Sequence, residues 1–407
     1  MARLSKIIYF LLIVLLSFQA QAKNPPPGIG TNIAANVLIM LDVSGSMSSK
    51  MYSSVRLWYP VDTAVDSNGN VYVMEYSYNR LAVFDDSGTF KKYIGSYGTR
   101  CNQWKYARQF DIYNDQIYIA DYYGHAIKVF DLNGNCVKSK IVNTSGYSNW
   151  CWGNNNCYPS GIAVGSNYTY VSYLNSYGRI TIHNTSNLSI SRTFTDTSRL
   201  YYNWNIDLNS SENAIVVNNY YSWGGRSPVV KYSVSGNNLA YSTTVGTYGS
   251  SSTNGNVFYA TGVAFDSNDN IYVTDYWQSR IQKFNSSGKY QAKTGSRQYG
   301  NPFYYPYGIT VDSSDNIYVA DYINLSVRKF DTSLTLLESY GGSAGSRLDV
   351  AKKVIKKIVS DSNLTSGANF GFMAWASYNQ IRVKISNNGA RDIYNDIDKV
   401  KNELAEN

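Results

Sequence analysis

Residues 259–284 have the sequence YATGVAFDSNDNIYVTDYWQSRIQKF, and this stretch decides the fold. An apolar-Tyr-apolar core at 271–273 predicts a strand, because β-branched and aromatic residues favour strands. The five residues before it, 266–270, carry the Asp, Ser and Asn side chains of a tight turn. An Asp-Tyr pair follows the core, and a further strand ends at Phe284. The stretch therefore predicts short antiparallel strands joined by turns.

The same pattern recurs along most of the chain. The core is found at residues 71–73, 117–119, 169–171, 271–273 and 317–319, with a degenerate version at 214–217. The strand after each core ends at Phe84, Phe130, His183, Tyr232, Phe284 and Phe330. These six markers are roughly 50 residues apart, which is typical of propeller blades of four strands each. The sequence predicts a six-bladed β-propeller.

Four of the blades carry an acidic residue directly before the loop tyrosine, namely Glu75, Asp121, Asp275 and Asp321. An acid in a strand-to-loop position invites a catalytic interpretation. Repetition at one place in successive blades favours a structural role instead, in turns and in hydrogen bonds between blades. We predict no catalytic residue among them.

The blade at 259–284 resembles an NHL repeat. Its Gly-apolar-Ala-apolar-Asp, Asn-apolar-Tyr-Val-x-Asp and Arg-Ile-x-x-Phe segments follow that family's pattern. The first, second, fifth and sixth blades match well, and the third and fourth have drifted. The resemblance implies that about residues 55–342 form the propeller.

A different signal precedes the repeats. Residues 37–41 are continuously apolar, as in a buried strand of a parallel sheet, and Asp42, Ser44 and Ser46 follow on one short loop. Ligands of α/β sheets bind beyond the carboxyl ends of strands, and these oxygens suit Mg²⁺ or another divalent cation. A plain turn is the alternative. The motif resembles the metal-ion-dependent adhesion site of von Willebrand factor type A domains.

The rest of that domain is expected after the repeats. Residues 346–359 and 392–404 have the apolar spacing of helices, and residues 369–376 and 380–385 have that of strands. We expect a signal peptide at 1–22, a first strand and metal loop at 23–48, the propeller at 49–342, and the continued type A domain at 343–407. The predicted fold is mainly β, with a six-bladed NHL-type propeller inserted into a partial α/β, Rossmann-like domain.

The metal site is expected to be incomplete. By the resemblance, a Thr and an Asp from later loops complete it, and the sequence ends at residue 407 before them. We therefore expect weak or no Mg²⁺ affinity, and tight binding in a calorimetric titration with Mg²⁺ would contradict this expectation.

The N-terminus predicts export. Arg3 and Lys6 precede an apolar run that is too short to span a bilayer, and Ala20-Gln-Ala22 is a small-x-small cleavage site. Export allows disulfides. We favour a local bridge between Cys151 and Cys157, with Cys101 and Cys136 as the second pair, although four cysteines allow three pairings. We expect no membrane span in the mature chain.

Charge and aromatic content favour a binding protein. The formal charge is +8, and removal of Arg3 and Lys6 leaves +6, which favours contact with anionic surfaces. Nucleic acid is not expected as a partner. The 39 Tyr and 8 Trp suit recognition of a protein or glycan at a cell surface, or packing between blades, and the sequence favours neither.

No catalytic constellation is found. His125 and His183, in expected outer-strand positions, are the only histidines, so a His-ligated catalytic metal is not expected. The alternatives to adhesion are a secreted propeller enzyme, similar to a lactonase or lyase, that acts in the central channel, and a non-catalytic assembly scaffold.

One further resemblance joins the two parts. Type IV pilus tip-associated adhesins of the PilC/PilY family carry a type A domain with an insertion after the metal loop. Residues 42–47 and 347–353 resemble the two flanks of that insertion. The family's insert is usually not an NHL propeller. The resemblance implies a secreted or cell-surface adhesin, with pilus subunits as possible partners.

Overall fold

The computed structural model describes residues 36–42, 50–52, 55–142, 158–174, 178–219, 228–250, 252–296, 303–341, 343–346, 369–376 and 380–384. The chain divides into two compact units, one formed by residues 1–49 and 347–407 and the other by residues 50–346. All described secondary structure is β-strand. Among the described residues, no helix has the length and apolar character needed to cross a membrane.

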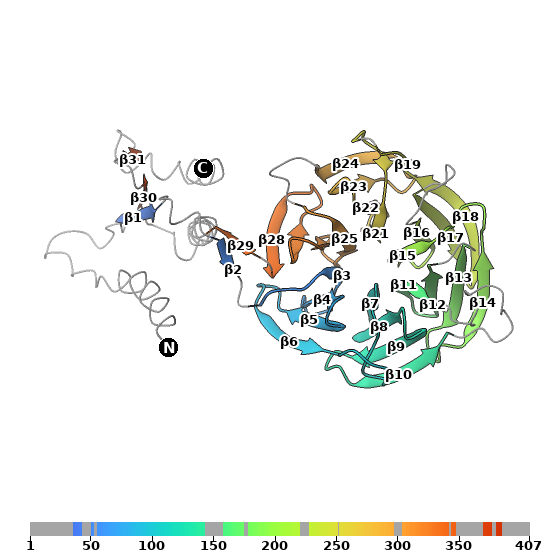
Figure 1. Ribbon diagram of the computed structural model, residues 1–407. Helices are drawn as coiled ribbons and strands as arrows, with labels where there is room; N and C mark the ends of the chain where they lie inside the picture. The colour runs from blue at the N-terminus through green and yellow to red at the C-terminus, as the bar shows by residue number, and fades with distance from the viewer. Residues whose placement is uncertain are drawn as a thin grey trace, which may run out of the picture. The chain divides into compact units, whose positions relative to one another are not determined.

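The larger unit is a ring of six four-stranded antiparallel sheets (Figure 1). The first three blades consist of β3 (Pro60–Val65), β4 (Val71–Glu75), β5 (Arg80–Phe84) and β6 (Phe90–Ile94); β7 (Phe110–Tyr113), β8 (Gln116–Asp121), β9 (Ala126–Asp131) and β10 (Cys136–Ile141); and β11 (Pro159–Val164), β12 (Tyr168–Tyr173), β13 (Arg179–Asn184) and β14 (Ile190–Thr195). The last three consist of β15 (Asn203–Leu208), β16 (Ala214–Asn219), β17 (Val229–Ser235) and β18 (Asn238–Val245); β21 (Ala260–Phe265), β22 (Ile271–Asp275), β23 (Arg280–Phe284) and β24 (Tyr290–Gly295); and β25 (Pro306–Val311), β26 (Ile317–Asp321), β27 (Ser326–Phe330) and β28 (Leu336–Gly341).

Each blade is one continuous stretch of chain whose strands pair in sequence order. The predicted apolar-Tyr-apolar cores form the second strands, and the six markers end or lie within the third strands, so the predicted six-bladed propeller is confirmed. His183 was expected on an outer strand, but it lies on the third strand β13, which pairs with β12 and β14, and its ring bonds Thr181 Oγ1 and Leu188 O. His125 instead lies in the loop before β9, with its ring against Tyr158.

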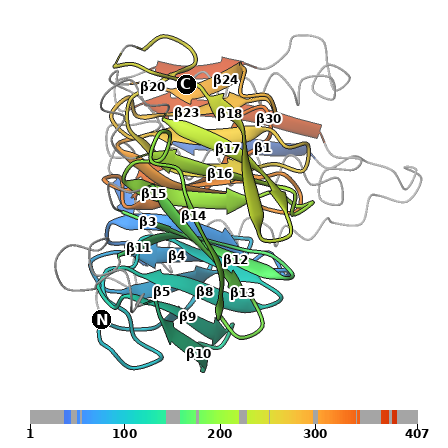
Figure 2. The same cartoon turned by 90° about the vertical axis from the view of Figure 1, so that its right-hand side faces the viewer.

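The ring closes by packing, without exchange of a strand between the first and last blades. Figure 2 shows the blades from the side. A buried cluster joins the two blades and includes Leu57, Phe84, Tyr318 and Tyr340. Burial of such aromatic and aliphatic side chains contributes about 1.5–3 kcal/mol each. The described part of the chain thus closes the ring through apolar contact.

Two short pairs of strands lie outside the blades. β19 (Thr247–Tyr248) pairs with β20 (Asn256–Val257) in the connection between the fourth and fifth blades. β2 (Lys50–Tyr52) pairs antiparallel with β29 (Ser343–Ser346). Residues 343–346 therefore pair with the chain that enters the propeller. From the sequence they were assigned to the following domain, with residue 346 as the start of a helix.

The smaller unit contains a three-stranded sheet in the order β1-β30-β31. β1 (Asn36–Asp42) pairs parallel with β30 (Asn369–Ala376), and β31 (Gln380–Lys384) pairs antiparallel with β30. The expected strands at 37–41, 369–376 and 380–385 are thus present. The predicted signal peptide at 1–22 and the residues 347–359 and 392–404, for which helices were predicted, lie outside the described residues.

Candidate ligand-binding face of the propeller

The loop acids hold the chain where it enters each blade. Their side chains accept hydrogen bonds from backbone N–H groups just before the first strand, from Trp58 to Glu75 (2.7 Å), Lys105 to Asp121 (2.7 Å), Tyr259 to Asp275 (3.3 Å) and Tyr304 to Asp321 (2.9 Å). In the fourth blade Asn219 takes the same role toward Tyr201 (2.8 Å). The structural role expected for the acids is confirmed. The bonds run within a blade, whereas bonds between blades were also expected.

Each acid also forms an ion pair with a base on the third strand of its blade. The pairs are Glu75–Arg80, Asp121–Lys128, Asp275–Arg280 and Asp321–Arg328. All four carboxylates are fully buried. Burial raises the pKa of Asp275 above its ordinary value, and the Arg280 charge opposes that rise. The charge pair therefore favours the ionised form of a desolvated carboxylate.

A tyrosine occupies the same entry position in every blade, namely Tyr59, Tyr106, Tyr158, Tyr202, Tyr259 and Tyr305. In five blades it directly follows a residue whose N–H bonds the loop side chain; before Tyr259 that residue is Phe258, which donates to Asp275 at 3.4 Å. Four of them have a positive φ, at 51° for Tyr59, 53° for Tyr106, 50° for Tyr202 and 63° for Tyr305. That conformation costs a residue with a Cβ roughly 1–2 kcal/mol and favours glycine. A repeated tyrosine there indicates that its ring has a use.

Part of that use is packing between blades. At four blade boundaries the entry tyrosine contacts the loop tyrosine of the preceding blade. The ring centroids are 4.9 Å apart for Tyr59–Tyr322, 5.2 Å for Tyr106–Tyr76, 5.0 Å for Tyr158–Tyr122 and 4.4 Å for Tyr305–Tyr276. The packing interpretation of the loop aromatics thus holds for these pairs.

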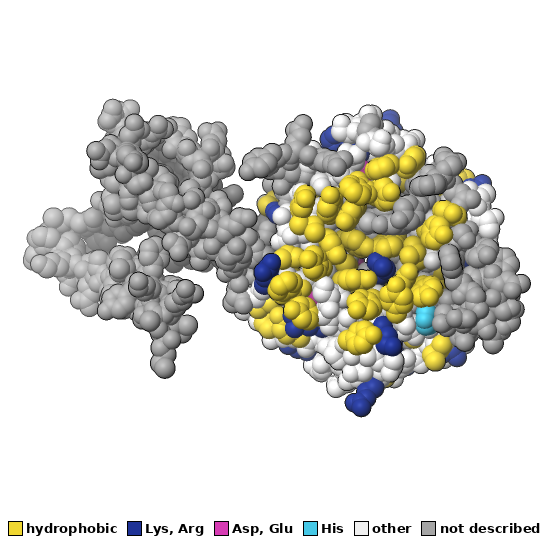
Figure 3. Space-filling model, in the orientation of Figure 1, with side chains coloured by type: hydrophobic (Ala, Val, Ile, Leu, Met, Phe, Trp, Pro, Cys, Tyr) yellow, Lys and Arg dark blue, Asp and Glu magenta, His cyan; other side chains and the backbone are white. Residues whose placement is uncertain are grey.

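The same aromatic residues leave surface exposed on one face of the ring. Figure 3 shows hydrophobic side chains, tyrosines included, that gather across this face. Tyr123 is 48% exposed and Tyr304 49%, and Tyr304 stacks on Tyr305 with centroids 4.7 Å apart. We define the aromatic face as Tyr59, Tyr76, Tyr106, Tyr122, Tyr123, Tyr158, Tyr276, Trp277, Tyr304, Tyr305, Tyr307 and Tyr322. Fixed, amphipathic rings of this kind suit recognition.

Arg108 contacts aromatic side chains from four blades. Its guanidinium lies 4.2 Å from the Trp204 ring centroid, 4.7 Å from that of Tyr122 and 5.3 Å from that of Tyr76. Its Nη1 donates a hydrogen bond to Tyr307 Oη at 3.2 Å. Burial lowers the pKa of Arg108. The neighbouring tyrosine oxygens raise it by more, so the pKa lies above its ordinary value. The residue is a permanent cation in an aromatic cage.

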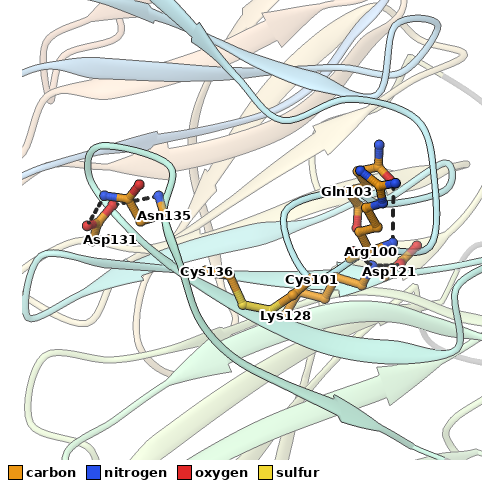
Figure 4. The surroundings of a disulfide bond; sticks show 8 residues. All are labelled: Arg100, Cys101, Gln103, Asp121, Lys128, Asp131, Asn135 and Cys136. Carbon is orange, nitrogen blue, oxygen red and sulfur yellow. Dashed lines mark hydrogen bonds and ion pairs between the residues drawn. A yellow bond between two sulfur atoms is a disulfide. The ribbon is translucent and has the colours of Figure 1, made fainter.

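The connection that carries Arg108 is firmly held (Figure 4). Cys101, in this connection, forms a disulfide with Cys136 at the start of β10, with the Cα atoms 5.7 Å apart. Lys128 Nζ donates to the carbonyl oxygens of Arg100 (2.8 Å) and Gln103. Trp104 is fully buried, and a Cβ on Gly95 would overlap its ring. These contacts position Arg108.

Gln109, next to Arg108, ties three successive blades together. It accepts hydrogen bonds from Ile162 N (2.9 Å) and Ile206 N (3.1 Å) and donates to Ile206 O (2.8 Å). It therefore joins the second, third and fourth blades.

Three aspartates on first strands join neighbouring blades. Asp62 accepts from Phe110 N at 3.0 Å, Asp111 from Val164 N at 2.8 Å, and Asp207 from Phe265 N at 2.7 Å. Burial raises the pKa of Asp111 to about 6 and that of Asp207 to about 7. Within the described residues no group of three His, Cys, Asp or Glu side chains could hold a metal ion.

The predicted metal loop is only partly described. Asp42 ends β1 and is opposite Trp375 in the parallel register. It thus lies at the carboxyl end of a parallel strand, where α/β sheets bind ligands. A carboxylate with two hydroxyls is a donor set that fits Mg²⁺. Ser44 and Ser46 lie outside the described residues, as do Cys151 and Cys157.

The sequence analysis missed Arg108 and the three axial aspartates. The position of Arg108 in the other blades is occupied by Val61, Ser160, Trp204, Thr261 and Tyr307. Arg108 is charged, whereas the residues at the same position of the other blades are not. An alignment of the six blade sequences with one another would have revealed this difference. The aspartates gave no such signal, because acids are common in these turns and strands.

Comparisons with known proteins agree with this architecture. A family model for the NHL repeat matches residues 259–284, one described as a six-bladed β-propeller matches residues 59–222, and one described as a β-propeller repeat matches residues 295–324. The chain therefore carries NHL-type repeats and a six-bladed propeller domain. No curated protein matches the sequence.

Solved structures show the same fold at low identity. A structural genomics protein of unknown function from Bacteroides thetaiotaomicron has a TM-score of 0.50 and 12% identity, over 70% of this chain and 74% of that chain. A streptogramin B lyase has a TM-score of 0.48 and 13% identity, over 72% and 86%. A virginiamycin B lyase from Staphylococcus aureus has a TM-score of 0.47 and 13% identity, over 72% and 87%. At such identities the likeness concerns the fold alone.

Proposed function

We propose that this chain is a secreted or cell-surface binding protein whose propeller presents the aromatic face to a glycan or protein ligand. The observation that carries the proposal is the tyrosine at the entry of every blade. Four of these tyrosines have a backbone conformation that favours glycine, and their rings remain partly exposed. A buried residue without backbone strain could provide packing alone. The conformational cost of the positive φ at these tyrosines is therefore consistent with a role at the surface.

The smaller unit supports an adhesion role for the same protein. Its parallel β1–β30 pair joins residues on both sides of the propeller sequence, and such pairs require a crossover connection. This arrangement agrees with a type A domain interrupted after its first strand. The proposed cation ligands are Asp42, Ser44 and Ser46, and a ligand carboxylate would complete the coordination of Mg²⁺. Export and association with a type IV pilus tip rest on sequence resemblance.

The first prediction concerns the aromatic face. Tyr304→Ser and Tyr123→Ser are each expected to weaken ligand binding by about 10-fold, because exposed tyrosines at interface centres contribute on the order of 1–2 kcal/mol. Binding of the purified chain to a printed panel of neutral and acidic glycans and matrix proteins measures this. Tyr241→Ser is the matched control, since Tyr241 is 44% exposed on the outer strand β18. Equal loss in all three variants would contradict the proposal.

The second prediction concerns the cation. Because the incomplete site is expected to bind Mg²⁺ weakly, the test is made at millimolar Mg²⁺, where a weak site is filled. Removal of the cation with EDTA, or Asp42→Ala, is then expected to lower binding to the same panel about 10-fold, because a bridging cation contributes a charge-assisted contact. Millimolar Mg²⁺ should restore the wild-type chain and not the variant. Asp86→Ala, at an exposed turn, serves as the control. Binding that survives both treatments would confine recognition to the propeller.

The alternative function is a propeller enzyme that acts at the axis. The raised pKa values of Asp111 and Asp207 favour it, since acids tuned toward neutral pH suit general acid or base roles. Two observations favour binding instead. Each aspartate already accepts a backbone hydrogen bond, and the nearby Gln109 amide is likewise bonded to backbone groups of the third and fourth blades.

A further inference from the structure

Arg108 lies where four blades converge. Tyr76 belongs to the first blade, Tyr122 to the second, Trp204 to the fourth and Tyr307 to the sixth, and all four contact the guanidinium. Blades one and four are on opposite sides of a six-membered ring. A side chain that reaches both must lie at the axis. Arg108 is therefore at the centre of the aromatic face.

The positive charge of Arg108 has no carboxylate partner among the described residues. Every described ion pair involves other bases, and the axial aspartates bond to backbone N–H groups. Nη1 is its one nitrogen with a hydrogen bond in the described part of the chain, while Nε is buried without a partner there. A buried donor without an acceptor costs about 1–3 kcal/mol. An anionic ligand group would supply the charge partner that the described residues do not.

We propose that Arg108 binds the carboxylate of an acidic saccharide, while the surrounding tyrosines contact the sugar rings. This inference deepens the proposed function and rests on it, because it names the ligand class of the aromatic face. The planar guanidinium fork matches a carboxylate, which can accept from two nitrogens at once. The exposed rings of the aromatic face, such as Tyr123 and Tyr304, offer apolar surface for the faces of sugars, and their hydroxyls offer hydrogen bonds to sugar hydroxyls.

Other anionic ligands fit the site less well. Phosphate and sulfate groups are usually held by clusters of several bases. Arg108 is a single cation surrounded by aromatic rings. Its one positive charge balances one negative charge of a ligand, not two. An extended acidic peptide would add a strand to a sheet edge, and the aromatic face is built from loops between strands. A carboxylated sugar uses both the charge and the rings.

The test is calorimetric titration of the full chain with tri-galacturonate and with its methyl ester, which has the same rings and no charge. We expect the acid to bind about 10- to 100-fold more tightly than the ester, as one charge-assisted hydrogen-bonding pair warrants. Arg108→Ala should lose that preference and bind both alike. Arg108→Lys keeps the charge without the fork and should be intermediate. Arg192→Ala, at an exposed site on β14, should match the wild type.

Each outcome decides between the hypotheses. If Arg108→Ala fails to fold by circular dichroism, Arg108→Lys and the acid–ester comparison on the wild type still test the proposal. Equal binding of acid and ester overturns the role of Arg108 but leaves the proposed function intact if Tyr304→Ser weakens both. A sulfated oligosaccharide or an acidic peptide that binds more tightly than tri-galacturonate overturns the ligand class. No binding of either trisaccharide overturns it as well.

Discussion

Arg280→Ala is expected to lower the free energy of unfolding of the propeller by about 3–5 kcal/mol, as removal of one partner from a buried ion pair does. The Arg280 and Asp275 side chains are 2% and 0% exposed, and Arg280 Nη2 lies 3.1 Å from Asp275 Oδ2. Arg280 Nη1 also donates to Ser252 O at 2.9 Å. The substitution therefore leaves a desolvated carboxylate without its charge partner.

The chain contains a matched control for this prediction. Arg199 pairs with Asp196 at 3.0 Å, but its side chain is 42% exposed. Arg199→Ala is expected to leave the free energy of unfolding nearly unchanged, because water replaces the lost partner. Urea denaturation of both variants, followed by far-ultraviolet circular dichroism and tyrosine fluorescence, measures the difference. Equal shifts in the two midpoints would show that burial of the pair does not set its contribution.

A third variant separates the pair from its surroundings. Replacement of both Asp275 and Arg280 by apolar residues should cost less than Arg280→Ala alone, because it leaves no buried charge without a partner. A double variant that loses the sum of the two single effects would instead indicate independent contributions. Asp275 and Arg280 would then each stabilise the loop through their own hydrogen bonds, and their mutual charge interaction would contribute little.

The propeller was predictable because its signals repeat. The apolar-Tyr-apolar cores and the acid-Tyr pairs recur in most blades, so each confirms the others and the count of blades follows. Even the drifted fourth blade keeps the geometry, with Asn219 in place of the acid. An amide oxygen accepts the same backbone bond, which explains why a departure from the pattern did not change the fold.

The centre of the candidate site was not predictable in the same way. Arg108 acquires its environment from Tyr76, Trp204 and Tyr307, which are far apart in sequence and meet only when the ring closes. The aromatic loops were noticed, but sequence could not separate packing from recognition. In the structure one ring can pack between blades and still leave part of its surface free for recognition. Tyr305, which stacks on Tyr276, is an example.

A rise in pH from 4 to 8 is expected to destabilise the propeller, and Asp207 is one described contributor. Burial raises its pKa from 3.8 to about 7, the hydrogen bond from Phe265 N opposes the rise, and the Asp111 charge adds to it. Between pH 4 and 7 the folded chain therefore keeps a proton on Asp207 that the unfolded chain has lost. Folding binds a proton in this window, so the free energy of unfolding falls as pH rises and levels off above pH 7.

The size of this effect follows from the shift of about three pKa units, which corresponds to on the order of 4 kcal/mol. Asp207→Asn keeps an oxygen for Phe265 N and cannot ionise, so it should flatten much of the fall between pH 4 and 7. The slope that remains belongs to Asp62 and Asp111, whose pKa values burial also raises. Urea midpoints at intervals of one pH unit give both slopes.

Asp131→Asn is the matched control for the pH series. Asp131 lies in an exposed turn, and hydrogen bonds from Asn135 hold its pKa below the ordinary value. Its stabilising effect is therefore complete above pH 4 and is lost only in more acidic solution, so this variant should keep the wild-type slope between pH 4 and 7. If Asp207→Asn also keeps that slope, the axial aspartate is ionised in the folded chain. Asp207 would then carry a negative charge at neutral pH. It lies on the same strand, β15, as Trp204, whose ring contacts Arg108.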